Sequence, residues 1–145
     1  MVNQISFSIN HLQHIGIPVS DISVSETFYK RLGFNNVMQA PFILEGDIGT
    51  CIMMKNKDVI IELYQLPGKQ LGEIKKRNNG HIDHIAFDVN DIDVAFKELK
   101  NNSFQVLEKE PAFLSFWEKG CRYFNISGPD GEQIEFNQLL KDSPG

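Results

Sequence analysis

Two short stretches of the chain alternate apolar and polar residues with a period of two, which is typical of β-strands. They are HIGIPV, residues 14–19, and HIAFDV, residues 84–89. In each stretch one face is apolar, and the opposite face begins with a histidine, His14 or His84. We therefore expect two similar strands, each with an apolar face packed against the rest of its half and a histidine on the other face.

A helical pattern follows each of these strands. Ser20 or Asp21 provides an N-cap for the first helix, and Asn90 or Asp91 provides one for the second. Apolar residues then recur at helical spacing in both segments, and Gly33 ends the first of them. The sequence thus predicts a strand followed by a helix, twice.

Three extended stretches follow each predicted helix, so that each half has the order βαβββ. In the first half they are residues 34–39, 50–54 and 59–65, and in the second half residues 104–108, 121–126 and 133–137. The fold class expected is α+β, built from two tandem βαβββ modules.

The two halves are related as an internal repeat. His14 and His84 lie 70 positions apart, and the same shift places Cys51 on Cys121 without a gap. A shift of 73 places Ile61-Glu62-Leu63 on Ile134-Glu135-Phe136. Each half therefore carries one histidine and one glutamate in corresponding places.

The repeat also predicts the domain organisation. We expect a single domain over residues 9–138, made of a first module (9–66) and a second module (81–138). Residues 67–80 are polar and contain glycine, so we expect them to form a linker between the modules.

The alternation of side chains along a strand places each glutamate, like each histidine, on the face opposite the apolar residues of its strand. Glu62 shares a strand face with Tyr64, and Glu135 shares one with Asn137, while the apolar neighbours of each glutamate point the other way. If the two halves pair about a pseudo-two-fold axis, two histidines and two glutamates could converge. Such a set suits a divalent transition metal. A decayed duplication that preserves these residue types without any metal is the alternative reading.

Composition and charge limit the partners of the chain. Its 145 residues include 41% hydrophobic residues, with a net charge of −5 and a pI near 5.3. This balance gives no basic surface for nucleic acid or an anionic membrane, and no apolar run is long enough to cross a bilayer. Two cysteines outside any CxxC motif fit a reducing compartment. We expect a cytoplasmic protein that acts on a small molecule.

The order of these motifs resembles a known superfamily. HIGIPVSD, a helix ending in FYKRLGF, the strand IELY, HIAFDVND and finally GPDGEQIEF together resemble the vicinal oxygen chelate superfamily, over about residues 10–138. This superfamily contains glyoxalase, bleomycin-resistance and extradiol-dioxygenase proteins. The resemblance implies paired βαβββ modules whose mixed sheet curls into a cup around a metal.

The resemblance also assigns roles to the repeated residues. It implies that the metal ligands are His14, Glu62, His84 and Glu135, a set most similar to that of glyoxalase I (lactoylglutathione lyase). Epimerases that act on acyl-CoA thioesters typically have Gln at the second of these positions. The implied chemistry is proton abstraction with stabilisation of an enediolate, on a hemithioacetal or a similar substrate with vicinal oxygens. Glu135 is the implied base and Glu62 its partner, with one divalent ion (Ni, Co, Zn or Mn) per site.

The expected substrate contacts depart from glyoxalase I. Pro18 and Leu66 occupy the places where bacterial glyoxalase I has an Arg and an Asn that hold glutathione, which argues for another thiol adduct or another oxygenated molecule. Arg122 could hold an anionic group of the substrate or could pair with a surface acid. The candidate substrate-binding residues are Arg122, Tyr64, Asn137, Phe116 and Trp117, although core or dimer packing is the safer interpretation of the aromatic pair Phe116 and Trp117.

Two function classes follow from this reading. The first is a metal-dependent lyase or isomerase of the glyoxalase I kind, and the second is a small-molecule binding protein like the antibiotic-sequestering members of the superfamily. The four intact ligand positions favour the enzyme, and the missing glutathione contacts keep the binding protein open. The resemblance further implies a homodimer, in which the metal site could be shared between subunits.

Overall fold

The computed structural model describes residues 4–31, 33–77, 82–127 and 133–141. The chain divides into two compact units. The first unit runs from His14 to Asp83, and the second runs from His84 to the C-terminal end and also includes the chain before His14.

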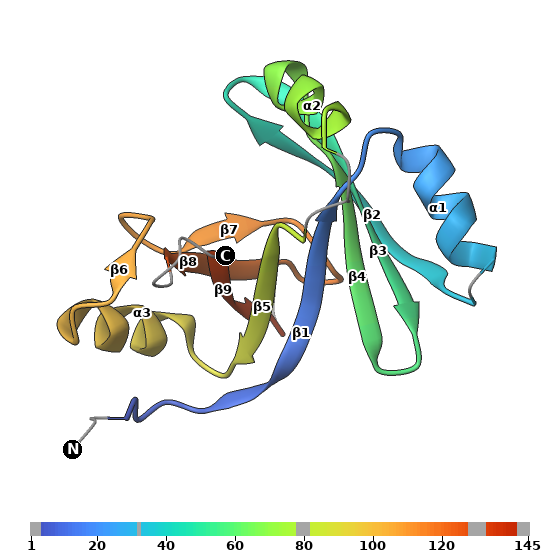
Figure 1. The fold of residues 1–145 in the computed structure, drawn as a ribbon. Coiled ribbons are helices and arrows are strands. Elements are labelled where there is room, and N and C mark those ends of the chain that lie inside the picture. The colour runs from blue at the N-terminus through green and yellow to red at the C-terminus, as the bar shows by residue number, and fades with distance from the viewer. Residues whose placement is uncertain (1–3, 32, 78–81, 128–132, 142–145) are drawn as a thin grey trace. The chain divides into compact units, whose positions relative to one another are not determined.

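The first unit has a four-stranded sheet with a helix on one face. The strands are β1 (Ile9–Pro18), whose second half belongs here, β2 (Asn35–Leu44), β3 (Asp47–Asn56) and β4 (Val59–Gln65), in the order β2-β3-β4-β1. β1 and β4 are parallel, and the other neighbours are antiparallel. Helix α1 (Ile22–Arg31) lies along this sheet, and α2 (Gly68–Lys75) follows β4 (Figure 1).

The second unit repeats this plan. Its strands are β5 (His84–Val89), β6 (Gln105–Val106), β7 (Ala112–Leu114), β8 (Cys121–Ser127) and β9 (Gln133–Leu139). The order is β5-β9-β8-β6, with β7 also paired to β8, and β5 and β9 are parallel. Helix α3 (Ile92–Asn101) packs against β6, β8 and β9.

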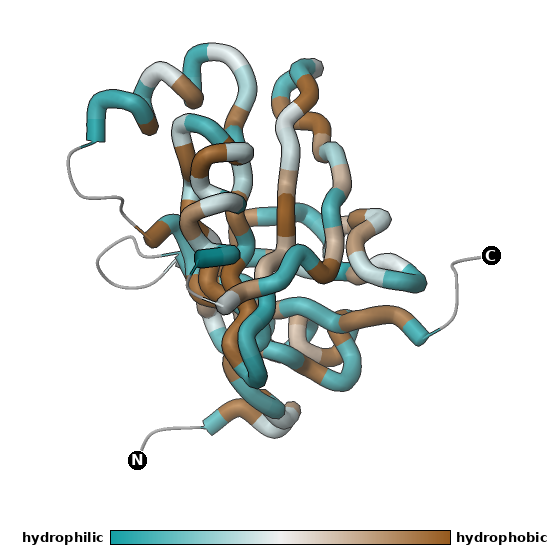
Figure 2. Tube along the Cα trace, turned by 90° about the vertical axis from the view of Figure 1, so that its right-hand side faces the viewer, coloured by the Kyte–Doolittle hydropathy of each residue, from teal (hydrophilic) through white to brown (hydrophobic). Residues whose placement is uncertain are grey.

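Each unit has its own apolar core on the helix side of its sheet. The first core contains Val19, Ile52, Met54, Ile61 and Leu63, and the second contains Val89, Ile92, Ala95, Leu99, Phe124, Ile126 and Phe136. The apolar neighbours of Glu62 and Glu135 lie in or against these cores. This confirms the prediction that the two glutamates lie on the opposite faces of their strands. Figure 2 shows hydrophobic and hydrophilic residues interspersed along the chain.

The predicted helix starts are confirmed by side-chain caps. The Asp21 carboxylate accepts hydrogen bonds from the backbone N–H groups of Ser23 and Val24, and Asp91 accepts the corresponding pair from Asp93 and Val94. Gly33, at the end of α1, has a φ of 93°, a left-handed conformation that favours glycine.

Some details differ from the sequence expectation. The segment 67–80, expected to be a linker, contains α2, whose Ile74 is buried. Residues 9–13, expected in the first module, group with the second unit, because the side chains of Asn10 and Gln13 hydrogen-bond to Asp88. The second half also gains the short strand β7. Residues 128–132, before the last strand, lie outside the described residues.

Replacing the cap of α3 tests its contribution to stability. Asp91→Ala removes the acceptor for two helix N–H groups, so we expect a loss of about 1 kcal/mol in the free energy of unfolding, measured by urea denaturation. Lys97→Ala, at an exposed position of the same helix, should change stability by less than about 0.5 kcal/mol. Equal stability of the two variants would contradict the capping role.

Candidate metal-ligand pairs in each unit

The first unit brings His14 and Glu62 together across parallel strands. Gly16 of β1 is the register partner of Glu62 on β4, so His14 lies two residues before that partner, on the same sheet face. His14 Nε2 and Glu62 Oε1 are 3.9 Å apart, and the two residues are 2% and 9% exposed. A buried imidazole thus faces a buried carboxylate.

The second unit repeats this arrangement with the same register. Ala86 of β5 is the partner of Glu135 on β9, and His84 again lies two residues before that partner. His84 Nε2 and Glu135 Oε1 are 3.4 Å apart, and both residues are buried. Each unit therefore has one His–Glu pair, formed by the same register between two parallel strands.

The spacing within each pair fits two ligands of one cation. Donor atoms about 2.1 Å from a metal with tetrahedral angles are about 3.4 Å apart. The His84–Glu135 distance of 3.4 Å has this value, and the His14–Glu62 distance of 3.9 Å exceeds it modestly. Neutral imidazole and carboxylate are also the donors that first-row divalent ions accept. The geometry of each pair thus suits two ligands of one metal ion.

The second oxygen of each carboxylate has a different neighbour. Asn137 Nδ2 donates to Glu135 Oε2 at 2.9 Å, whereas Cys51 Sγ lies 3.6 Å from Glu62 Oε2. Gln13 Nε2 in turn donates to Asn137 Oδ1 at 3.1 Å. Neither the repeat nor the strand alternation points to Gln13, although a polar residue directly before His14 is a visible signal.

Of the candidate substrate-binding residues, Tyr64 and Asn137 lie on the faces that carry the glutamates. Tyr64 is buried, and its ring packs edge-on against Phe42 at 6.4 Å between centroids. Burial raises the pKa of Tyr64 far above its ordinary value, and the negative charge of Asp83 adds to this effect. The phenol therefore stays protonated and can act only as a neutral hydrogen-bonding group.

Arg122 lies on the helix side of the second sheet. It shares a face of β8 with Phe124 and Ile126, which belong to the core under α3, and so points away from the face of Glu135. Its guanidinium binds both carboxylate oxygens of Asp93 at 2.7 and 2.9 Å. Of the two readings of Arg122, the structure shows the surface ion pair.

The aromatic residues Phe116 and Trp117 lie between β7 and β8. Phe116 is 4% exposed, and Trp117 is half-buried with a φ of 64°. The Trp117 indole nitrogen is buried without an acceptor among the described residues. Phe113 lies nearby in β7.

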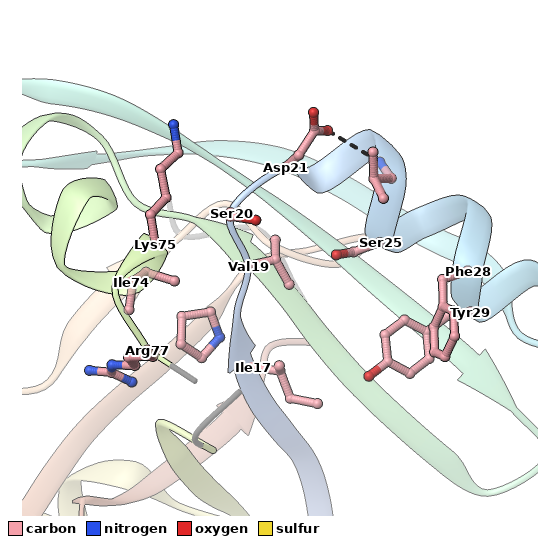
Figure 3. Close-up of a pocket in the computed structure, with 12 residues that line it drawn as sticks. Ile17, Val19, Ser20, Asp21, Ser25, Phe28, Tyr29, Ile74, Lys75 and Arg77 are labelled. Atoms are coloured by element: carbon pink, nitrogen blue, oxygen red, sulfur yellow. Dashed lines mark hydrogen bonds between the residues drawn. The ribbon is translucent and has the colours of Figure 1, made fainter. Parts of the chain in front are cut away.

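A cavity in the first unit lies apart from the His14–Glu62 pair. Its volume is about 680 Å³, and it is bordered by the end of β1, by α1 and by α2 (Figure 3). Ile17 and Val19, which line it, belong to the strand face opposite His14. Pro18, in the place of the glutathione-binding Arg, also lines it. Neither His14 nor Glu62 is among the residues that line this cavity.

Comparison with known proteins places this arrangement in a family. The model of the Glyoxalase/Bleomycin resistance protein/Dioxygenase superfamily matches residues 13–123, a span that contains His14, Glu62 and His84. The chain belongs to this superfamily. The predicted resemblance and fold class are thereby confirmed, whereas a particular closeness to glyoxalase I is not shown.

Individual relatives support the same assignment. The uncharacterized protein YwbC of Bacillus subtilis is 31% identical over 137 residues, covering 88% of this chain and 96% of the relative. The mitochondrial methylmalonyl-CoA epimerase of Bos taurus is 21% identical, over 91% of this chain and 76% of the enzyme. A methylmalonyl-CoA epimerase variant of Streptomyces coelicolor, solved with 2-nitronate-propionyl-CoA, is 22% identical with a TM-score of 0.73, over 92% of this chain and 99% of that chain.

The described helices give no sign of a membrane span. No helix within the described residues is long and apolar enough to cross a bilayer.

The ion pair of Arg122 predicts a change in titration. The Arg122 guanidinium lowers the pKa of Asp93, so the pair stabilises the fold at neutral pH, and this contribution is lost as the pH falls through that lowered pKa. In Arg122→Gln the pKa of Asp93 should rise toward its ordinary value, as measured by an NMR titration of carboxyl groups. Arg77→Gln, which removes the partner of Glu73, should leave Asp93 unchanged. An unchanged Asp93 in Arg122→Gln would show that the pair does not persist in solution.

Proposed function

We propose that the protein is a metal-dependent enzyme that moves a proton on a carbon next to a carbonyl group. The observation that carries this proposal is the buried His–Glu pair in each unit, at 3.9 and 3.4 Å and in the same strand register. When bound, a divalent ion would supply Lewis-acid stabilisation of the negative charge on an enediolate. His14 and His84 would serve as ligands, and the glutamates would both hold the ion and exchange the proton.

Two carboxylates allow one group to remove the proton and the other to return it. One glutamate can take the proton from carbon, and the other can return a proton from its own side of the substrate. Glu135 is the proposed base and Glu62 its partner, as the superfamily resemblance implies. Burial keeps water away from both groups, which strengthens their electrostatic effect on the reacting atoms.

The proposed substrate is a hemithioacetal or a similar molecule with adjacent oxygens, as for glyoxalase I. Support comes from Glu62, a carboxylate at the position where acyl-CoA epimerases typically have Gln. The thiol need not be glutathione, because Pro18 and Leu66 provide no anchor for its glutamyl carboxylate. A metal site completed by two copies of the chain would make the enzyme a homodimer.

Epimerisation of an acyl-CoA thioester is the second candidate. It is favoured by the likeness to methylmalonyl-CoA epimerases, which extends over more than nine-tenths of this chain. The reaction uses the same proton transfer next to a carbonyl, so the two His–Glu pairs suit it as well.

Metal binding is the first measurement. Protein prepared without a histidine tag or chelators should hold about one Ni, Co, Zn or Mn ion per set of two His and two Glu, as measured by elemental analysis. The double variant Glu62→Gln, Glu135→Gln and the single variant His14→Ala should lose it. His11→Ala, an exposed histidine on the same strand, should retain it.

Reloading the metal should also stabilise the fold. At a free metal concentration of about 100 Kd we expect about 2.7 kcal/mol of added stability, read from thermal unfolding. A wild-type protein that takes up none of the four metals would overturn the enzyme proposal and favour a binding protein of the same fold.

Proton transfer is tested with deuterium. The metal-loaded protein in D₂O should exchange the carbon-bound proton of hemithioacetals prepared from several thiols, and Glu135→Gln should slow this exchange about 10²- to 10⁴-fold. Exchange confined to an acyl-CoA thioester such as methylmalonyl-CoA would select the second candidate. Metal uptake without exchange in either substrate class would contradict both.

A further inference from the structure

We propose that Gln13 and Asn137 are positioning residues that fix the orientation of the Glu135 carboxylate toward His84. This inference rests on the proposed metal site and adds two residues that act through Glu135. It concerns side chains of the second unit alone, since Gln13 belongs to that unit.

The two oxygens of Glu135 have separate partners. Oε1 faces His84 Nε2 at 3.4 Å, and Oε2 accepts a hydrogen bond from Asn137 Nδ2 at 2.9 Å. With Oε2 held in this way, rotation of the carboxylate about its last bond would break a buried hydrogen bond. Oε1 is therefore kept on the side of the imidazole, where the proposed ion would bind.

The orientation of the Asn137 amide is itself determined by Gln13. Gln13 Nε2 donates to Asn137 Oδ1 at 3.1 Å, so the oxygen of the amide must face Gln13 and its NH₂ group must face Glu135. A flipped amide would place its oxygen against the Glu135 carboxylate and its NH₂ against the NH₂ of Gln13. Both contacts would be repulsive, so one amide orientation is strongly preferred.

Gln13 is held in turn by an acidic residue. Its Nε2 lies 3.1 Å from Asp88 Oδ1, and Asp88 Oδ2 accepts from Asn10 Nδ2 at 2.7 Å. Asp88 is also the register partner of Asn137, which brings β5, β9 and the start of β1 into one network. Gln13 and Asn137 are only 4% and 3% exposed, so water does not compete for these hydrogen bonds.

The first unit lacks this amide pair. The residue two positions after its glutamate is Tyr64 rather than Asn, and the residue preceding the second histidine is Asp83 rather than Gln. Near Glu62 Oε2 lies the sulfur of Cys51 at 3.6 Å, and a thiol is a weak donor. The repeat thus keeps both His–Glu pairs but has two amides, Gln13 and Asn137, at positions where the first unit has Asp83 and Tyr64, whose side chains hydrogen-bond to each other.

The experiment measures metal affinity rather than turnover. Asn137→Leu removes the donor to Glu135, and Gln13→Met removes the group that orients Asn137, both at nearly constant volume. Each should weaken metal binding about 10- to 100-fold, measured by competition with a chelator. With Co²⁺ as the probe, the visible absorption spectrum should also change, which a general loss of stability would not cause.

The matched control is Gln138→Leu. Gln138 is an amide on the same strand, and its Oε1 accepts the backbone N–H of Ile92 at the start of α3, on the opposite sheet face. This variant should lose stability but keep the wild-type metal affinity and Co²⁺ spectrum. A loss of affinity as large as that of Asn137→Leu would show that general destabilisation explains the effect and would overturn the proposal.

A double variant tests whether the two residues act in series. If Gln13 acts through Asn137, the variant with both changes should bind metal no more weakly than Asn137→Leu alone. Additive losses would overturn this order of action. Should Asn137→Leu fail to fold, Asn137→Ser replaces it, since its hydroxyl is too short to reach Glu135 in the same way.

The outcomes separate this inference from the proposed function. A wild-type protein that binds no metal refutes the metal site itself. A wild-type protein that binds metal, together with Asn137→Leu and Gln13→Met variants that bind it equally well, refutes the positioning role and leaves the metal site intact.

Discussion

The position of both His–Glu pairs depends on one constraint, the register between two parallel strands in each unit. β1 pairs with β4 so that Gly16 is opposite Glu62, and β5 pairs with β9 so that Ala86 is opposite Glu135. A shift of one residue in either pair would turn the glutamate into the apolar core and its neighbours out of it. Because both faces of each strand are specified by burial, the register is fixed by packing, and the His–Glu distance follows from it.

Hydrophobic packing therefore positions the polar side chains of the two His–Glu pairs. Ile61 and Leu63 anchor β4 in the first core, and Phe136 anchors β9 in the second. Burying a glutamate is costly unless it is hydrogen-bonded or paired with a cation. Glu135 meets this condition through Asn137 Nδ2, which donates a hydrogen bond to its Oε2.

The sequence predicted the elements that depend on local pattern. Period-two alternation located β1 and β5, and the caps Asp21 and Asp91 located both helix starts, because these signals come from residues close in the chain. The repeat located the glutamates, since corresponding residues in a duplicated unit take corresponding faces. Helix α2 was missed because its segment is polar and contains two glycines, Gly68 and Gly72, which lower helix propensity.

What the sequence could not predict depends on contacts between distant segments. The side of the sheet taken by Arg122 was readable from parity, but its partner Asp93 lies on a helix, 29 positions earlier in the chain. Gln13 and Asn137 are separated by 124 positions, and neither stands out alone as a functional residue. Only the fold brings them side by side, because the hydrogen bond from Gln13 Nε2 to Asn137 Oδ1 joins the start of β1 to β9. A repeat with the same His–Glu pair in each unit can thus differ in the residues next to each carboxylate, since Asn137 lies beside Glu135 and Cys51 lies beside Glu62.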